Sequence, residues 1–110
     1  MPDTYLFVAV LVYSTAVEGG YTPVRFSEDV VPIRARTSDE ARTIAERVGL
    51  DGQTCYPNEF GETVRWSFLG VADLQMAQGD DLEPGVSLYS RSFDDLDQYR
   101  RLYAPWEGER

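Results

Sequence analysis

The feature that most constrains the fold is a stretch of fifteen residues, from Glu62 to Met76, that alternates with period two. Its even positions are nearly all apolar: Val64, Trp66, Phe68, Gly70, Ala72, Leu74 and Met76. Its odd positions are mixed: Arg65, Ser67, Leu69, Val71, Asp73 and Gln75. This alternation is typical of a long, half-buried strand. Because such a strand must coil to stay over a core, we expect a bulge or a bend at Gly70.

Two strands are predicted before this stretch. Residues 4–15 are apolar on both faces, which indicates a central strand or a face covered by a second chain. A turn at residues 18–23 contains two glycines and a proline, so we expect a hairpin to a second strand over residues 24–36. The Glu28-Asp29 pair and Pro32, which has no N–H to donate, place this second strand at an edge, with a bulge.

A helix is predicted after the second strand. Thr37 and Glu40 have the spacing of a capping box, and acidic residues in the first turn suit the helix dipole. A narrow apolar stripe follows at Ala41, Ile44, Ala45 and Val48. Gly49 predicts the end of the helix in the left-handed conformation.

The remaining segments complete the predicted fold. Residues 51–61 are expected to form a loop with a short extended piece at residues 54–57. After the long strand, residues 77–85 form a polar connection and residues 86–93 alternate as a last strand. A short helix over residues 94–103, capped by Ser92 or Asp94, precedes a frayed tail at residues 104–110.

These elements predict one α+β domain over residues 1–110, with its core in residues 4–103. The expected architecture is a four- to five-stranded, mainly antiparallel sheet with one capped helix packed on one face and a short C-terminal helix. The order of elements is ββαββα.

Composition excludes several classes of function. The chain has 19 acidic residues against 10 arginines, no lysine and a net charge of −9, which opposes binding to nucleic acid or anionic membranes. Its N-terminal apolar run is shorter than the about 20 residues that span a bilayer, so we expect a cytoplasmic protein. Cys55 is the sole cysteine and histidine is absent, which removes the commonest metal ligand and general base. We therefore predict no catalytic residue, metal or cofactor.

The candidate binding residues lie on the mixed face of the last two predicted strands: Arg65, Asp73, Tyr89 and Arg91. An antiparallel register that pairs the ends of these strands brings Asp73 near Tyr89 and Arg91. One interpretation is an Asp73–Arg91 ion pair that stabilises a hairpin by at most about 1 kcal/mol. The other is a polar face that binds an anionic or peptide ligand, with Arg65 further along it.

A second candidate surface is acidic and consists of Asp80, Asp81, Glu83, Asp94, Asp95 and Asp97. With Asp73, these residues give the segment 73–97 seven acids against the single Arg91. A solvated acidic surface is the simpler interpretation. The same pattern is also expected of an inhibitor or immunity-type protein that binds a basic partner.

Four segments, residues 5–11, 37–41, 62–74 and 86–91, carry a resemblance to a known family. The most specific pieces are Glu62-Thr-Val-Arg-Trp66 and Tyr89-Ser-Arg91. On these segments the chain resembles a family of small bacterial proteins described only as a domain of unknown function. The resemblance implies no activity. The chain departs from the family at Tyr5-Leu6, where a tryptophan is common, and beyond Phe93.

We expect the chain to be a non-catalytic protein-interaction or assembly domain. The two apolar faces of the first strand and an aromatic content of 13% favour self-association, most simply as a symmetric homodimer. An acidic inhibitor of a basic protein and a domain that binds a small anionic ligand are the alternatives.

Overall fold

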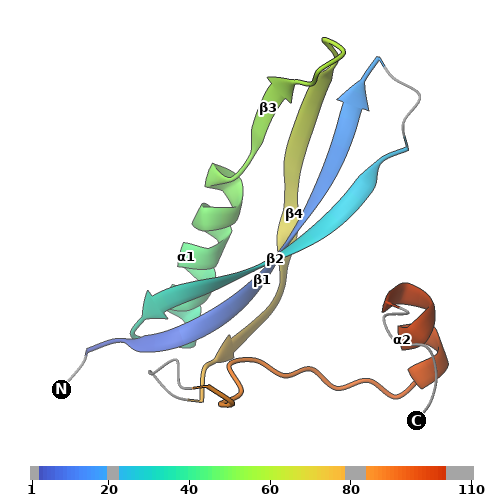
Figure 1. The fold of residues 1–110 in the computed structure, drawn as a ribbon. Helices are drawn as coiled ribbons and strands as arrows, with labels where there is room; N and C mark the ends of the chain where they lie inside the picture. The colour runs from blue at the N-terminus through green and yellow to red at the C-terminus, as the bar shows by residue number, and fades with distance from the viewer. Residues whose placement is uncertain (1–2, 20–22, 79–83, 104–110) are drawn as a thin grey trace.

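The computed structural model describes residues 3–19, 23–78 and 84–103 (Figure 1). Six elements follow one another: β1 (Tyr5–Glu18), β2 (Arg25–Ala35), α1 (Ser38–Asp51), β3 (Thr54–Pro57), β4 (Thr63–Met76) and α2 (Leu96–Tyr103). The strands form one antiparallel sheet in the order β2-β1-β4-β3. The α+β class and the ββαββα order are therefore confirmed, and the predicted tail at residues 104–110 lies outside the described residues.

The core lies between α1 and the face of the sheet that carries the odd-numbered side chains of β1. Its buried members are Phe7, Ala9, Leu11, Tyr13, Ile33, Ala35, Ala41 and Ala45. Trp66, Phe68 and Leu74 of β4 are partly buried and pack against this cluster. The prediction that α1 shields the apolar side of the long strand is confirmed for these three residues.

The pairing of β4 with β1 is interrupted at two places. The flanking pairs are Val10–Asp73 and Leu11–Val71 at the first place, and Val12–Gly70 and Tyr13–Phe68 at the second. One residue of β4 is left over at each place, Ala72 and Leu69, as in a β-bulge. The irregularity predicted around Gly70 is confirmed, and its φ of 152° is a backbone conformation that favours glycine.

The two bulges change the predicted faces of β4 only between them, because the first moves the following side chains to the opposite face and the second restores the predicted alternation. Val71 was predicted on the mixed face but packs against the core. Ala72 was predicted in the core but is left over at a bulge and is exposed. Met76 pairs with Phe7 on the core side, as predicted, but is exposed at the end of the strand.

β1 occupies a central position and β2 an edge, as predicted. β1 continues to Glu18, three residues beyond its expected end. The bulge predicted in β2 is wrong, because its register with β1 is unbroken along the whole hairpin. Pro32 lies opposite Val8. Since proline has no N–H, this must be a non-hydrogen-bonded pair, and the missing donor is on the outer side of the edge.

The predicted cap of α1 is confirmed. The backbone N–H of Glu40 donates to Thr37 Oγ1 at 3.1 Å. The Glu40 carboxylate accepts hydrogen bonds from the backbone N–H and the guanidinium of Arg36, instead of the bond to Thr37 that a full capping box has. The hydrogen bond to the Arg36 side chain lowers the pKa of Glu40. The predicted stop at Gly49 is wrong: α1 continues to Asp51, and Gly52 caps it with a right-handed φ of −81°.

The C-terminal part differs most from the prediction. The short extended piece at residues 54–57 forms β3, at the second edge of the sheet. The strand predicted at residues 86–93 is wrong, because this segment is irregular and pairs with no strand in the part of the chain that the structure describes. α2 begins at Leu96, and its capping residue is Asp95, whose Oδ1 accepts from the N–H of Gln98 at 3.0 Å. We call residues 84–95 the C-terminal arm.

Candidate interaction face

The face of the sheet opposite α1, which we call the outer face, carries the even-numbered side chains of β1. Leu6, Val8 and Val10 are buried there, whereas Val12 is half-buried. The described part of the chain places no helix over these three buried residues; instead the C-terminal arm runs along this side of the sheet (Figure 1).

Two hydrogen bonds join the arm to β4. The Tyr89 hydroxyl donates to Asp73 Oδ2 at 2.8 Å, and the side-chain amide of Gln75 donates to the carbonyl of Ser90 at 2.6 Å. Because Asp73 and Gln75 pair with the buried residues of β1, their side chains lie on the outer face. The arm is therefore held over the outer face at the C-terminal end of β4.

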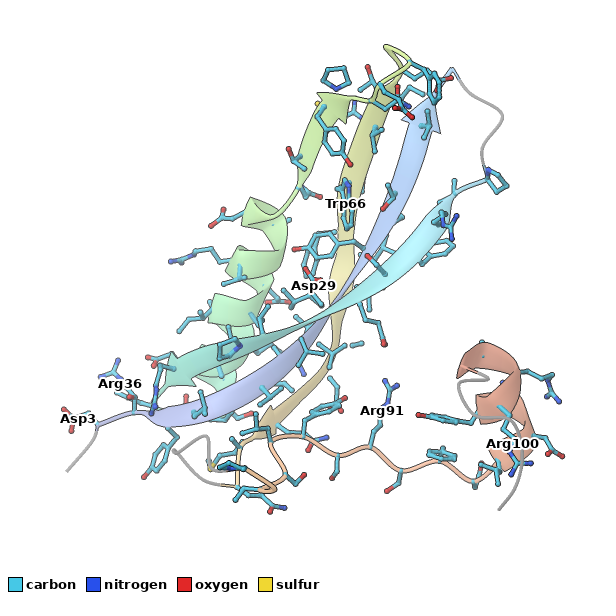
Figure 2. The ribbon with its side chains drawn as sticks, in the orientation of Figure 1. Asp3, Asp29, Arg36, Trp66, Arg91 and Arg100 are labelled. Atoms are coloured by element: carbon cyan, nitrogen blue, oxygen red, sulfur yellow. The ribbon has the colours of Figure 1, made fainter. Side chains whose placement is uncertain are left out.

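An ion pair joins the arm to the edge strand. Arg91, which points from the arm toward the sheet in Figure 2, lies 3.5 Å from the Glu28 carboxylate of β2. Since the preceding anchors are on β4, the arm crosses the outer face from β4 over β1 to β2. Along this path the arm covers the second apolar face of β1, so this cover comes from the same chain.

The hydrogen bond between Tyr89 and Asp73 shifts the pKa values of both side chains. The hydrogen bond from Tyr89 lowers the pKa of Asp73, and the hydrogen bond from Gln75 and the charge of Arg91 act in the same direction. Burial raises the pKa of Tyr89, and its bond to the Asp73 carboxylate raises it further. Near neutral pH the carboxylate is therefore ionised and the hydroxyl protonated, which is the combination that the hydrogen bond needs.

The structure brings together three of the four predicted binding residues. Asp73, Tyr89 and Arg91 meet at the arm, although through a crossing segment rather than a paired strand. Arg65 lies near the opposite end of β4, where its guanidinium is 3.3 Å from the Glu18 carboxylate. Eight positions along a strand separate it from Asp73, which is about 25 Å. Ligand binding by these residues stays a prediction, with Arg65 outside the cluster.

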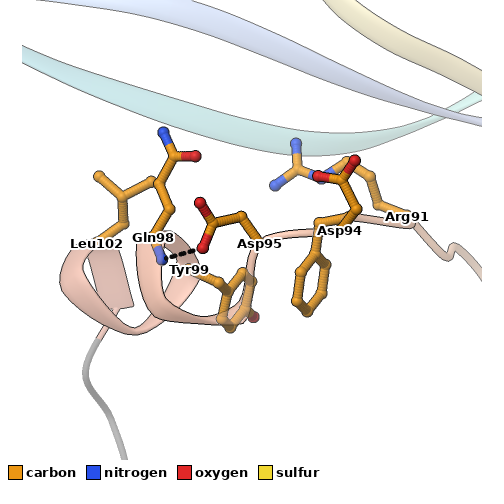
Figure 3. A pocket seen from close by; sticks show the side chains of 7 residues that line it. Arg91, Asp94, Asp95, Gln98, Tyr99 and Leu102 are labelled. Atoms are coloured by element: carbon orange, nitrogen blue, oxygen red, sulfur yellow. Dashed lines mark hydrogen bonds between the residues drawn. The ribbon is translucent and has the colours of Figure 1, made fainter.

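The predicted acidic surface is described only in part. Asp94, Asp95 and Asp97 are exposed where the arm meets α2. Asp94 and Asp95 line a hollow together with Arg91, Gln98 and Leu102 (Figure 3). Phe93 stacks on Tyr99 in this region, with ring centroids 4.4 Å apart. Asp80, Asp81 and Glu83 lie outside the described residues.

The sequence prediction missed an apolar patch on the outer face, which consists of Val12, Phe26, Val30 and Leu69. Phe26, Val30 and Leu69 are 68%, 61% and 57% exposed. Val12 lies at its centre, because it lines one hollow with Phe26 and another with Leu69. The signal for it was present in β2, where Phe26 and Val30 are four positions apart and therefore share one face of a strand.

A comparison with known protein families shows which family the chain belongs to. A family model described as a domain of unknown function, DUF4288, matches residues 6–90, which is more than half of the chain. The chain belongs to the DUF4288 family. No curated protein and no solved structure matches it. The DUF4288 match includes the sheet except its first residue, Tyr5, together with α1 and the Tyr89–Asp73 contact, and it ends before α2.

One further property concerns membranes. Among the residues that the structure describes, no helix combines the length and the apolar character needed to cross a bilayer.

Proposed function

We propose that this DUF4288 chain is a non-catalytic interaction domain that assembles as a symmetric homodimer through the apolar patch. The observation that carries the proposal is the exposure of Phe26, Val30 and Leu69 on one side of the sheet. Single apolar side chains are common on protein surfaces. Phe26 and Leu69 each line a hollow with the half-buried Val12, and apolar surface that is grouped in this way is characteristic of an interaction site instead.

The accessible area of the chain supports assembly. It is 8239 Å², whereas a compact monomer of 12.5 kDa exposes about 6,200 Å². The radius of gyration is 17.4 Å, compared with about 13 Å for a compact domain of this length. A stable dimer buries about 800 Å² on each partner, so the surplus is large enough for such an interface.

The outer face is a better contact between copies than the edge of β2. The backbone N–H groups of β2 that point away from β1 could pair with a strand of a second copy. Pro32 has no N–H and interrupts this row of donors, which leaves residues 25–31 for such pairing. Antiparallel pairing of two copies of this segment about its centre sets Glu28 opposite its own counterpart. Like charges in that position are destabilising, and charged edges are known to prevent such pairing.

Light scattering during size-exclusion chromatography tests the proposal. We expect a dimer for the full chain at micromolar concentration. Phe26→Ser removes the largest apolar side chain of the patch and should raise the dissociation constant at least about tenfold. Phe60→Ser is the matched control, because Phe60 is 76% exposed in the connection between β3 and β4. A strict monomer for the unmodified chain would refute the homodimer.

The second candidate function is inhibition of a basic partner protein. Asp94, Asp95 and Asp97 favour it, because three exposed carboxylates at one junction can accelerate association with a cationic surface. A monomeric chain that retains a basic protein at low salt and releases it at high salt would favour this function over the homodimer.

The cytoplasm is the location that we propose for either function. The single cysteine, Cys55, is free and exposed, which fits a reducing compartment.

A further inference from the structure

The side of β4 that faces away from β1 is only partly covered. β3 pairs with residues 63–66 of β4, and among the described residues no strand lies beside residues 67–76 on that side (Figure 1). No charged residue lies between Arg65 and Asp73, and most of this segment is apolar. An uncharged, apolar strand segment with a free edge is prone to pair with a strand of another chain.

The hydrogen-bond pattern shows which backbone groups point outward from this edge. The N–H of Ala77 donates to the carbonyl of Leu6 in β1 at 2.9 Å. Because the direction of the N–H groups alternates along an antiparallel strand, those of Leu74 and Met76 point away from β1. These are the donors with which a strand of a second chain would pair.

Side-chain oxygens cap two of the outward donors of β4. Asp73 Oδ1 accepts a hydrogen bond from the N–H of Leu74 at 2.8 Å. Gln53 Oε1, immediately before β3, accepts from the N–H of Phe68 at 3.0 Å. A donor that is already bonded gains little from a new partner, so an added strand would first have to displace these caps.

The outer edges of β2 and β3 also lack a donor, because each contains a proline. Pro32 is on the outer edge of β2. On β3, the N–H of Asn58 donates to the carbonyl of Glu62 at 2.8 Å, so Pro57 occupies a position whose N–H would point away from β4. Protection of its edges is therefore a common property of this sheet, and on β4 side chains provide it.

We infer that Asp73, assisted by Gln53, closes the free edge of β4 to pairing with β4 of a second copy of the chain. A second copy is the partner in question because it has the same edge, and two such edges match each other in an antiparallel arrangement. This role is separate from the proposed homodimer, which uses the outer face.

The two oxygens of Asp73 divide the work between the edge and the arm. Oδ1 caps the N–H of Leu74, whereas Oδ2 accepts from the Tyr89 hydroxyl at 2.8 Å and from the Gln75 amide at 3.0 Å. The bonds to Oδ2 hold the carboxylate in the orientation that caps the edge. The carboxylate that anchors the arm is thus the one that blocks the strand.

Asp73→Ala tests this inference, because it removes the cap. Association is followed by light scattering and thioflavin T fluorescence over a series of protein concentrations. We expect Asp73→Ala to form assemblies larger than those of the unmodified chain, at a concentration at least about fivefold lower. Gln53→Ala removes the other cap without touching the arm and should act in the same direction, which keeps the test valid if Asp73→Ala does not fold.

Two matched variants separate the cap from the arm. Asp73→Asn keeps an oxygen that accepts from Leu74 and should behave like the unmodified chain. Tyr89→Phe removes the bond to the arm but keeps the cap, and should also behave like the unmodified chain. Association of either variant to the level of Asp73→Ala would overturn the inference, as would Asp73→Ala that associates no more than the unmodified chain.

A proline locates the association on β4. Since the N–H of Met76 points away from β1, Met76→Pro removes an outward donor without removing a bond to β1. Added to Asp73→Ala, it should restore the behaviour of the unmodified chain. Association that persists in this double variant would place it at another surface and overturn the inference. The homodimer is unaffected by any of these outcomes, because each variant is compared with the unmodified chain in its own oligomeric state.

Discussion

At the scale of single residues, Gly49 shows how one side chain sets the distance between α1 and the sheet. A β-carbon at this position would clash with ring atoms of Phe68 from β4. The hydroxyl of Tyr13 from β1 donates to the Gly49 carbonyl at 2.9 Å, and the Tyr13 and Phe68 rings are 5.5 Å apart. The glycine is therefore a point of close packing inside the helix rather than its end.

We predict that Gly49→Ala destabilises the fold, although alanine is the better helix former by about 1 kcal/mol. Overpacking of a filled core costs about 1–3 kcal/mol and acts in the opposite direction. Urea unfolding should show a net loss in the free energy of unfolding of up to about 2 kcal/mol.

The matched control for this substitution is the same change in a Phe68→Leu background. The smaller side chain leaves space for the new methyl group, so the loss should shrink in the double variant. A stabilising effect of Gly49→Ala in the unmodified chain would contradict the packing role of the glycine.

At the scale of elements, the C-terminal arm is the clearest case of tertiary structure overriding a local pattern. Residues 86–93 alternate like a strand, and among the described residues β4 has no strand partner at residues 67–76 on the side away from β1. The arm lies across the outer face instead. In this position the arm covers apolar side chains of β1. These side chains would be exposed to water if the arm paired with the free edge of β4 instead.

The Tyr89–Asp73 bond should control the detachment of the arm. We predict that Tyr89→Phe accelerates tryptic cleavage after Arg91 by roughly fivefold, which corresponds to the loss of a hydrogen bond of about 1 kcal/mol. Ser87→Ala is the control, because Ser87 bonds only within the arm, to the Tyr89 carbonyl. Equal cleavage rates for the two variants would mean that the bond does not hold the arm.

The lowered pKa of Asp73 makes the attachment sensitive to acid. A carboxyl whose pKa is lower in the folded state stabilises that state above its unfolded pKa of about 4, and this contribution disappears as the pH falls through the folded pKa. We therefore expect the free energy of unfolding, measured with urea, to decrease as the pH falls below about 4. Tyr89→Phe should weaken this dependence, and an unchanged profile would refute the assignment.

At the scale of the whole molecule, the chain is more extended than a compact domain of its length, with a radius of gyration of 17.4 Å. The sheet, α1 and the arm form one body, and α2 stands at its edge (Figure 1). Burial of the apolar patch against a second copy would couple the stability of each chain to the concentration of protein.

The melting temperature should accordingly depend on concentration. For a dimer of this size, each tenfold increase in protein concentration should raise the melting temperature by about 3–5 °C. Phe26→Ser should remove this dependence, whereas Phe60→Ser should retain it. A melting temperature that is constant over a hundredfold range would contradict an obligate dimer.

The sequence by itself determined the features that depend on neighbours within a few positions. The period of the stretch from Glu62 to Met76 identified the long strand, and the pair Thr37–Glu40 identified the start of α1. The meeting of Asp73 with Tyr89 was also anticipated, although from the pairing of a strand at residues 86–93 that the structure does not contain.

Tertiary structure alone decided the features that depend on distant partners. Pairing with β1 created the two bulges that moved Val71 into the core, and the ring of Phe68 explains why Gly49 lies within α1. The apolar patch is likewise the part of the outer face that the arm leaves uncovered. The physical reason is that burial is a property of the whole chain, so a local pattern states which side chains need cover but not what covers them.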